Sequence, residues 1–216
     1  MRFPRKKAAL AIAAGLSIVG IAAAATETFV FDKAHSQVGF QIRHFLTKVE
    51  GRFRDYDGRI VIDRQNPAKS QVEVRIQAAS IDTGNEKRDA DLKSANFFEV
   101  EKYPTITFKS AKVTPSGKDL YLVTGDLTMH GVTKTMVIPV RHTGFLNLGK
   151  MEKAGFEVTF PINRKDFGIT WNRSLDSGGA MLGDDVQITV LVEANKETPA
   201  APAPATPEPT KAPASR

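Results

Sequence analysis

The chain has 216 residues, of which 41% are hydrophobic and none is cysteine, and its formal net charge is +6. The lack of cysteine excludes a disulfide framework, a thiolate metal site and a cysteine nucleophile. Four of the positive charges lie in the first 25 residues and a net one lies after Thr198, so the segment between them is left near +1. A nucleic-acid-binding function, which needs a clustered basic face, therefore has no support in the charge.

The first 25 residues have the pattern of a secretory signal peptide. Residues 2–7 hold four basic side chains, residues 8–23 form an apolar run, and Ala23-Ala24-Ala25 offers small residues for cleavage. We predict that 1–25 is a signal peptide cleaved near Ala25 and that the mature protein is periplasmic or secreted. The alternative is an uncleaved membrane anchor, because the apolar run is of borderline length for spanning a bilayer.

Alternating apolar and polar residues follow, with the period of half-buried strands. The apolar positions of one parity recur in five clear runs: Val38 to Ile42, Val72 to Ala78, Tyr121 to Leu127, Phe156 to Ile162 and Val186 to Val192. In the last run Leu191 is an apolar exception to the alternation. Counting the weaker runs as well, we expect about eight strands in residues 26–197.

Turn and helix signals separate these runs. Asp57-Gly58 is a candidate turn or bulge, and Pro115-Ser116-Gly117 and His130-Gly131 are candidate turns between strands. Thr83 and Glu86 have the spacing of a capping box, which predicts one short helix extending to about Asn96. Residues 141–155 have no clear period and are expected to be a looser, glycine-containing region.

The composition changes sharply after Glu197. Six of the twelve prolines lie there, among threonines, alanines and a few charges. Such a segment has too little apolar surface to order itself, so we predict a disordered Pro/Ala-rich tail at 198–216. A specific wall-binding or partner-binding segment is the alternative.

Eight strands with one apolar face each must hide that face in a sandwich or in a closed barrel. The strands are long, the connections are local, and no cysteine pair of the immunoglobulin type is present. These features favour an antiparallel barrel. Twelve of the thirteen phenylalanines lie after residue 25, and an eight-stranded barrel lined by such rings is just wide enough to hold one slender ligand.

Six blocks in order resemble the YceI-like family of exported polyisoprenoid-binding proteins. They read DKAHSQVGFQIRH, EGRF with DYDGRI, SIDTGNEKRDADLKSANFFEVEKYPTITFKS, GDLTMHGVTK, INRKDFGI and GDDVQITV. The resemblance covers roughly Thr28 to Ala194. It implies an all-β, lipocalin-like, eight-stranded antiparallel barrel with one or two short helices, whose apolar pore holds a long isoprenoid tail such as that of a polyprenyl phosphate or a quinone.

The candidate pore-lining residues are the apolar side chains of one strand parity, with two phenylalanines after the helix that would plug or gate one end. They are Val38, Phe40, Ile42, Val72, Val74, Ile76, Phe97, Phe98, Ile106, Phe108, Phe156, Val158, Phe160 and Ile162. The parity alone leaves open whether these side chains surround a cavity or form a solid core. The family resemblance favours the cavity.

Polar residues in otherwise apolar segments are candidates for the head group of the ligand, because arginine and histidine bind phosphate and quinone oxygens well. They are His35, Arg43, His44, Asn163, Arg164 and Asp166. The alternative for His35 and Ser36 is hydrogen bonding within a turn. The alternative for Arg164 and Asp166 is an ion pair at the surface.

No catalytic residues, metal ligands or cofactors are predicted. The four histidines lack HxH or HExxH spacing, and no Ser, His and Asp set suggests a triad. We therefore expect a non-catalytic protein that carries, stores or protects an isoprenoid lipid, with peripheral membrane exchange and a homodimer as further options. The alternatives are an enzyme or enzyme accessory acting on such a lipid, and a stress-related structural protein.

Overall fold

The computed structural model describes residues 26–174 and 180–198. The predicted signal peptide at 1–25 and the predicted tail from residue 199 onward lie outside the described residues. Within the described ranges, no helix has the length and apolar character needed to cross a membrane.

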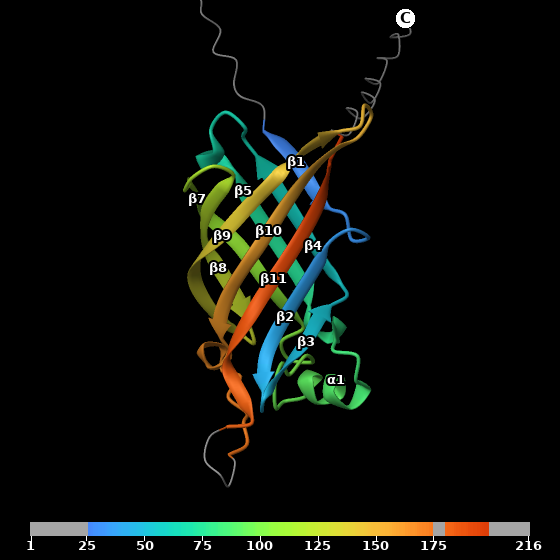
Figure 1. Cartoon of the computed structure of the whole chain (residues 1–216), viewed down its shortest axis with the longest axis vertical. Coiled ribbons are helices and arrows are strands. Elements are labelled where there is room, and N and C mark those ends of the chain that lie inside the picture. Colours follow the sequence, from blue (N-terminus) through green and yellow to red (C-terminus); the bar gives the residue numbers. More distant parts are fainter. Residues whose placement is uncertain (1–25, 175–179, 199–216) are drawn as a thin grey trace, which may run out of the picture.

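Most of the described chain is β-structure (Figure 1). The strands are β1 (Glu27–Phe31), β2 (Gln37–His44), β3 (Thr47–Phe53), β4 (Tyr56–Ile62), β5 (Gln71–Gln77), β6 (Ile81–Asp82), β7 (Thr105–Pro115), β8 (Leu120–Met129), β9 (Val132–Asn147), β10 (Glu152–Asn163) and β11 (Leu182–Lys196). The helices are α1 (Glu86–Lys93) and three 3₁₀ turns, η1 (Pro67–Lys69), η2 (Ala78–Ser80) and η3 (Arg164–Phe167).

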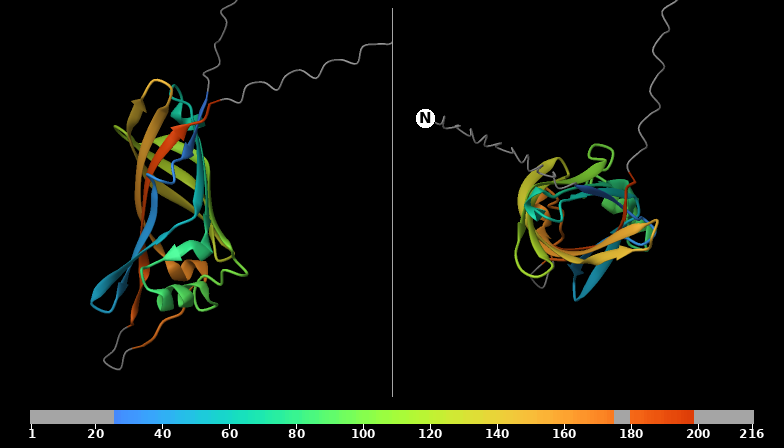
Figure 2. Two further views of the ribbon diagram at one scale, coloured as in Figure 1. Left: turned by 90° about the vertical axis from the view of Figure 1, so that its right-hand side faces the viewer. Right: turned by 90° about the horizontal axis from the view of Figure 1, so that it is seen from above.

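Eight of these strands form a closed antiparallel barrel. Their order is β1-β4-β5-β7-β8-β9-β10-β11, and β11 pairs back onto β1 through Phe29↔Lys196 to Phe31↔Ala194. Seen along its axis, the sheet forms a complete ring (Figure 2). The prediction of an eight-stranded antiparallel barrel is confirmed.

The remaining strands, β2, β3 and β6, arise because three long strands are interrupted, one of them between β5 and β6 at η2. β1 and β2 pair with successive parts of the same edge of β11, and the chain bulges outward between them at residues 32–36. There the Asp32 N–H donates to the Glu193 carbonyl, and the Ser36 hydroxyl donates to the same carbonyl at 3.0 Å. β3 and β4 are likewise two parts of one long strand, which is interrupted at Arg54 and Asp55.

The turn or bulge predicted at Asp57-Gly58 is wrong. Both residues lie inside β4, opposite Arg75 and Val74 of β5. Glycine at position 58 is explained by a close contact and not by a turn. The backbone there lies against the Phe31 ring, and a Cβ atom would come within 2.4 Å of it. Glycine is the residue that permits such contact.

Two other turn predictions are confirmed. Residues 116–119 connect β7 to β8, and His130-Gly131 forms a two-residue turn between β8 and β9 with φ angles of 51° and 74°. The looser region expected at 141–155 is wrong, because β9 continues to Asn147 and β10 begins at Glu152. The two strands form one regular hairpin with a register shift at Gly155/Phe156.

The helix is shorter than predicted and begins differently. Asn85, not Thr83, is the N-cap, and its side chain accepts a hydrogen bond from the Arg88 N–H at 3.0 Å. The Thr83 hydroxyl instead donates to Asp89 at 2.5 Å. Asparagine is among the best N-cap residues, which explains why Asn85 caps the helix in place of Thr83. The helix ends at Lys93.

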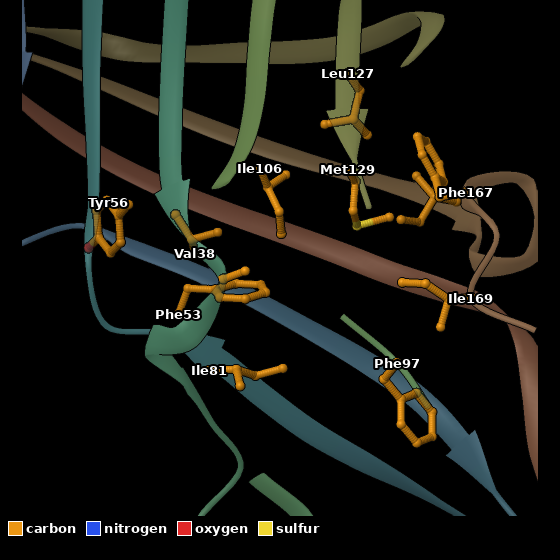
Figure 3. Packing of buried hydrophobic residues seen from close by; sticks show 12 residues of the cluster. Val38, Phe53, Tyr56, Ile81, Phe97, Ile106, Leu127, Met129, Phe167 and Ile169 are labelled. Atoms are coloured by element: carbon orange, nitrogen blue, oxygen red, sulfur yellow. The ribbon is translucent and has the colours of Figure 1, made fainter. Parts of the chain in front are cut away.

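The tightest packing lies at the end of the barrel beside α1, the lower end in Figure 1. We call this cluster the plug; its members include Phe53, Ile81, Phe97, Phe167 and Ile169 (Figure 3). The Phe97 ring lies 5.2 Å from that of Trp171, and the Phe53 ring meets Phe98 edge-on at 5.8 Å. The plug gathers many of the buried apolar side chains at the lower end, and some of them, such as Phe53, Phe97 and Ile169, also border the space inside the barrel.

Candidate functional site

Above the plug the barrel encloses a cavity of about 610 Å³. This volume falls within the range of small-molecule sites in proteins. The cavity wall is almost entirely apolar. All fourteen predicted pore residues line it: Val38, Phe40, Ile42, Val72, Val74, Ile76, Phe97, Phe98, Ile106, Phe108, Phe156, Val158, Phe160 and Ile162.

The register of neighbouring strands explains why these side chains share one surface. On β10 and β11 the direct partners are Phe156↔Val192, Val158↔Val190, Phe160↔Ile188 and Ile162↔Val186, and all eight line the cavity. Residues directly opposite each other in a sheet point to the same face. Every second rung of the pairing therefore adds an apolar pair to the wall.

Of the six predicted head-group residues, the structure places only His44 and Arg164 at the cavity wall. Arg43 is exposed on the outer face of β2, and Asn163 and Asp166 also lie outside the cavity lining. His35 is on the outer surface. A role for any of the six in binding a head group stays a prediction.

Arg164 is 3% exposed and already uses most of its hydrogen-bonding capacity. Its Nε donates to the Gly183 carbonyl at 2.9 Å, and its two Nη atoms donate to the carbonyls of Ile169 and Trp171 and to Asp184. Burial lowers the pKa of this guanidinium, and the Asp184 carboxylate opposes the shift. Arg164 therefore ties the segment after η3 to β11.

The surface pair suggested for Arg164 and Asp166 is wrong, because the partner of Arg164 is Asp184 at 3.2 Å. The residues next to Arg164 in the sequence do not predict this ion pair. Asp184 is separated from Arg164 by twenty residues and is brought beside it by the start of β11.

His35 takes part in a charged cluster on the outer surface, and the turn hydrogen bonding suggested for it is confirmed. Its Nδ1 lies 3.0 Å from Asp32 Oδ2, and its backbone N–H donates to the Asp32 carbonyl. Lys153 Nζ donates to Asp32 at 3.0 Å and to Glu193 at 2.5 Å. Hydrogen bonds from His35 and then from Lys153 hold the pKa of Asp32 far below its usual range.

This cluster also offers three ligand atoms for a metal, since those of Asp32, His35 and Glu193 lie within 4.8 Å of one another. The ammonium of Lys153 bridges the two carboxylates, however, and supplies the positive charge that they need. A cation at this position would have to displace Lys153. The geometry is that of an ion-pair cluster that fixes the bulge between β1 and β2.

The upper end of the cavity, away from α1, carries polar residues that the sequence analysis did not single out. Its lining includes Asp63, Arg64, His142 and Phe145. The Arg64 guanidinium lies 3.8 Å from the centre of the Phe145 ring and forms ion pairs with Glu27 and Glu152. A cation over an aromatic face in this geometry is attractive.

Lys196 completes a ring of charges around Arg64. Its Nζ lies 2.6 Å from Glu27 and 2.9 Å from Glu152. Hydrogen bonds from Arg64 and then from Lys196 lower the pKa of Glu152. The four side chains come from the ends of β1, β4, β10 and β11, so they hold the seam of the barrel together at its upper end.

His142 lies in this upper end among aromatic rings, with ring centres 4.4 Å from Phe145 and 5.2 Å from Phe156. Burial lowers the pKa of His142, so its imidazole is neutral at pH 7. Among the described residues its Nε2 has no hydrogen-bond partner. The side chain therefore behaves mainly as part of the apolar wall.

At the lower end, α1 contributes Lys87, Arg88 and Asp91 to the cavity lining. Arg88 is held in place because its Nε donates to the Thr83 hydroxyl at 2.7 Å and its Nη2 to the Thr83 carbonyl at 2.9 Å. The cavity is thus a long apolar space with polar groups at both ends. This shape suits an amphiphile with a long hydrocarbon tail.

Comparison with known proteins decides the family. Residues 29–194 match the model of the YceI-like domain. This chain belongs to the YceI-like family. The match covers the described barrel from its first strand almost to the end of β11, so the resemblance predicted from the six sequence blocks is confirmed.

Relatives of this YceI-like protein include a UPF0312 protein of Azotobacter vinelandii, which is 39% identical over 171 residues; these cover 76% of this chain and 88% of the relative. A crystal structure of a Campylobacter jejuni YCEI protein is 35% identical, with a TM-score of 0.63 and coverage of 77% and 96%. The fold is also shared with a polyisoprenoid binding domain from Saccharophagus degradans implicated in plant cell wall breakdown, at 16% identity, TM-score 0.59 and coverage of 78% and 98%.

Proposed function

We propose that this YceI-like protein binds a long isoprenoid lipid, such as a polyprenyl phosphate or a quinone, in the cavity of its barrel, and carries, stores or shields that lipid without catalysis. The observation that carries the proposal is the uninterrupted apolar wall around a cavity of about 610 Å³. Eight strands supply it through one parity of residues. A protein that needed only a stable core would gain by filling this space.

The shape of the cavity favours a tail over a compact ligand. β11 has 15 residues, so at about 3.3 Å per residue it runs roughly 50 Å, and the usual strand tilt of about 35–45° leaves a barrel axis of roughly 35–40 Å. The plug occupies only the lower part of this length. An extended hydrocarbon chain fits the remaining space, with a polar head at either end.

The energetics agree with a tail of several isoprene units. Burial gives about 0.8 kcal/mol per methylene, so one five-carbon unit contributes roughly 4 kcal/mol before costs. Association and chain ordering cost about 4–15 kcal/mol. Several buried units are needed for useful binding. Since the free lipid already lies in a membrane, the net preference is smaller than this sum.

A protein with the same fold supports the choice of an isoprenoid as the ligand. The Saccharophagus degradans domain that shares the fold is a polyisoprenoid binding domain. Its identity of 16% extends to the architecture alone, so the specific lipid is argued from the cavity of this chain. Its apolar wall and polar ends are what an isoprenoid with a head group requires.

The proposal leaves catalysis out, and two charged groups of the cavity wall, Arg164 and Arg64, are engaged in fixing the barrel. Arg164 is bonded to three carbonyls and Asp184, and Arg64 to two carboxylates. The proposal also includes export to the periplasm or beyond, which rests on the basic and apolar pattern of residues 1–25, and exchange of the lipid with a membrane.

The first test is chemical. The full chain is expressed in a bacterial host, the mature protein is purified without detergent, and an organic extract is analysed by mass spectrometry. We expect a near-stoichiometric prenyl lipid, whose mass also identifies the head group. An empty extract, together with no uptake of added geranylgeraniol or ubiquinone, would contradict the proposal.

A pair of variants on β5 separates the cavity from the outer surface. Val74→Trp places a large side chain in the cavity, whereas Arg75→Trp places the same side chain on the exposed face of the same strand. We expect Val74→Trp to abolish geranylgeraniol uptake and Arg75→Trp to retain it. Equal uptake by both variants would mean that the ligand does not occupy the barrel.

A further inference from the structure

The hairpin between β9 and β10 ends in exposed apolar side chains. We call residues 144–151 the hairpin tip; in Figure 1 it is the yellow-brown turn at the upper right. Phe145, Leu146, Leu148 and Met151 are 38%, 55%, 53% and 44% exposed. Half of the large exposed apolar residues of the described chain therefore gather within seven positions, and such a gathering marks a surface that contacts something apolar.

The hairpin tip has a defined turn. The Leu148 N–H donates to the Met151 carbonyl at 2.8 Å, and the Gly149 N–H donates to the Asn147 side chain at 2.8 Å. Gly149 takes the left-handed conformation that the turn requires, with φ of 82°. These bonds fix the shape of the turn that carries the exposed apolar side chains.

The apolar surface of the tip is continuous with the cavity. Phe145 lines the cavity and is also 38% exposed. Its ring lies 5.9 Å from that of Phe29 and 4.4 Å from that of His142, both at the upper end of the barrel. A hydrocarbon chain that left the cavity along Phe145 would pass the Arg64 guanidinium, which covers that ring, before it reached the apolar tip.

The charge of the tip favours an anionic partner. Residues 141–151 contain Arg141 and Lys150 and no carboxylate. The nearest acidic residue in sequence, Glu152, is paired with Arg64 and Lys196, which also pair with Glu27. The tip therefore presents apolar side chains together with the positive charge of Lys150, while Arg141 lies opposite Glu157 on the neighbouring strand.

We infer that the hairpin tip inserts into the surface of an anionic lipid bilayer, and that the lipid ligand passes between bilayer and cavity along Phe145. The inference rests on the proposed function, to which it adds the docking surface and the port. A tip with apolar side chains at the end of β9 and in the turn that follows fits a fluid bilayer, which closes around it. The lysine within the tip binds anionic head groups.

The experiment uses the mature chain and vesicles of phosphatidylethanolamine with a minor share of phosphatidylglycerol. Leu146→Asn/Leu148→Asn removes two exposed apolar side chains, neither of which lines the cavity wall. The matched control is Leu46→Asn, a side chain that is 100% exposed at the β2–β3 turn near the lower end. We expect the double variant to lose at least about tenfold in vesicle binding and the control to lose little.

The same samples report on the cavity separately. Uptake of geranylgeraniol from detergent-free solution is expected to be normal in the double variant, while its transfer from vesicles slows at least about tenfold. Val74→Trp is expected to show the opposite, with vesicle binding kept and uptake lost. If the double variant binds vesicles as the unaltered protein does, the docking surface is wrong even where uptake supports the proposed function.

Two further outcomes would also overturn the inference. If Leu46→Asn weakens vesicle binding as much as the double variant, the contact is general and not specific to the tip. If the double variant changes a dimer to a monomer on size exclusion and leaves vesicle binding unchanged, the tip contacts a second copy of this chain. Weaker binding when phosphatidylglycerol is omitted is expected from Lys150.

Discussion

The two ends of the barrel are built from the same alternating strands, yet the buried apolar cluster at the lower end is larger than the one at the upper end. At the lower end Phe167 and Ile81 are each 2% exposed within the plug. At the upper end Phe145 is 38% exposed, and the rings beside it border the cavity. The comparison shows that strand parity decides which side chains point inward and does not decide whether the interior is filled.

The difference comes from segments outside the barrel strands. The stretch after α1 brings Phe97 and Phe98 under the barrel, and η3 and the residues after it bring Phe167 and Ile169. At the upper end, η1 and the hairpin tip supply polar or exposed residues, and these do not fill the interior of the barrel. Connections between strands therefore decide where the barrel is closed.

The largest effect is expected for Phe167→Ala in the plug. This ring is 2% exposed and does not border the cavity, so its removal leaves a new void. We expect a loss of about 3–5 kcal/mol in the free energy of unfolding. Urea unfolding followed by circular dichroism measures it, and a loss as small as that of an exposed site would mean that the lower end is not solidly packed.

Phe156→Ala is the matched change at the upper end and is expected to cost less. The Phe156 ring already faces the cavity, so its removal enlarges an existing space and forfeits fewer contacts. A loss of about 1–2 kcal/mol is expected. If Phe156→Ala and Phe167→Ala are equally destabilising by urea unfolding, the contrast between the two ends fails.

Arg64→Met tests the charge ring at the upper end. Methionine keeps the contact with Phe145 but leaves Glu27 and Glu152 with Lys196 alone. Arg64 is 38% exposed, so we expect only about 1 kcal/mol. Because the pKa of Glu152 is lowered in the folded state, this stability is present above pH 4.3 or so and is lost as the pH falls through the folded value. The two proteins should therefore converge in stability in acid, as measured by urea unfolding at several pH values.

His142→Phe is expected to give the smallest effect, visible as a change of slope with pH. Since the pKa of His142 is lowered in the folded state, the unfolded chain takes up the proton first as the pH falls below about 6.5. The natural protein should lose stability from that point until the folded pKa is passed. In thermal melts at a series of pH values, His142→Phe should lack this loss of stability. If both proteins show the same dependence of melting temperature on pH, His142 is more solvated than its surroundings indicate.

Much of this fold was predictable because parity is a local property. The alternation in residues 156–162 and 186–192 predicted which side chains face inward, and the structure places both runs on the cavity wall as paired rungs. The interruptions of β1/β2 and β3/β4 were not predictable in this way. They depend on hydrogen bonds such as that from Ser36 to the Glu193 carbonyl, which joins residues far apart in sequence.

The polar part of the site was predicted less well for the same reason. Arg164 was singled out correctly as unusual, but its partner Asp184 depends on how β11 begins. Arg64, His142 and Phe145 were missed because Arg64 follows β4 whereas His142 and Phe145 lie in β9, and only barrel closure brings them together. The cluster of Phe145, Leu146, Leu148 and Met151 in a glycine-containing stretch was the available signal.

The position of β11 also has a consequence for how this chain reaches its native state. One edge of β1 pairs with β4, but its other edge finds a partner only in the last described strand, since Phe29 lies opposite Lys196. Bringing such distant segments together carries a large loop-closure cost, and all-β topologies of this kind fold in milliseconds to seconds. A chain that emerges with its amino terminus first holds the edge of β1 unpaired until residue 196 is free. Barrel closure is then the final step, and until it occurs the whole apolar inner face is open to other chains.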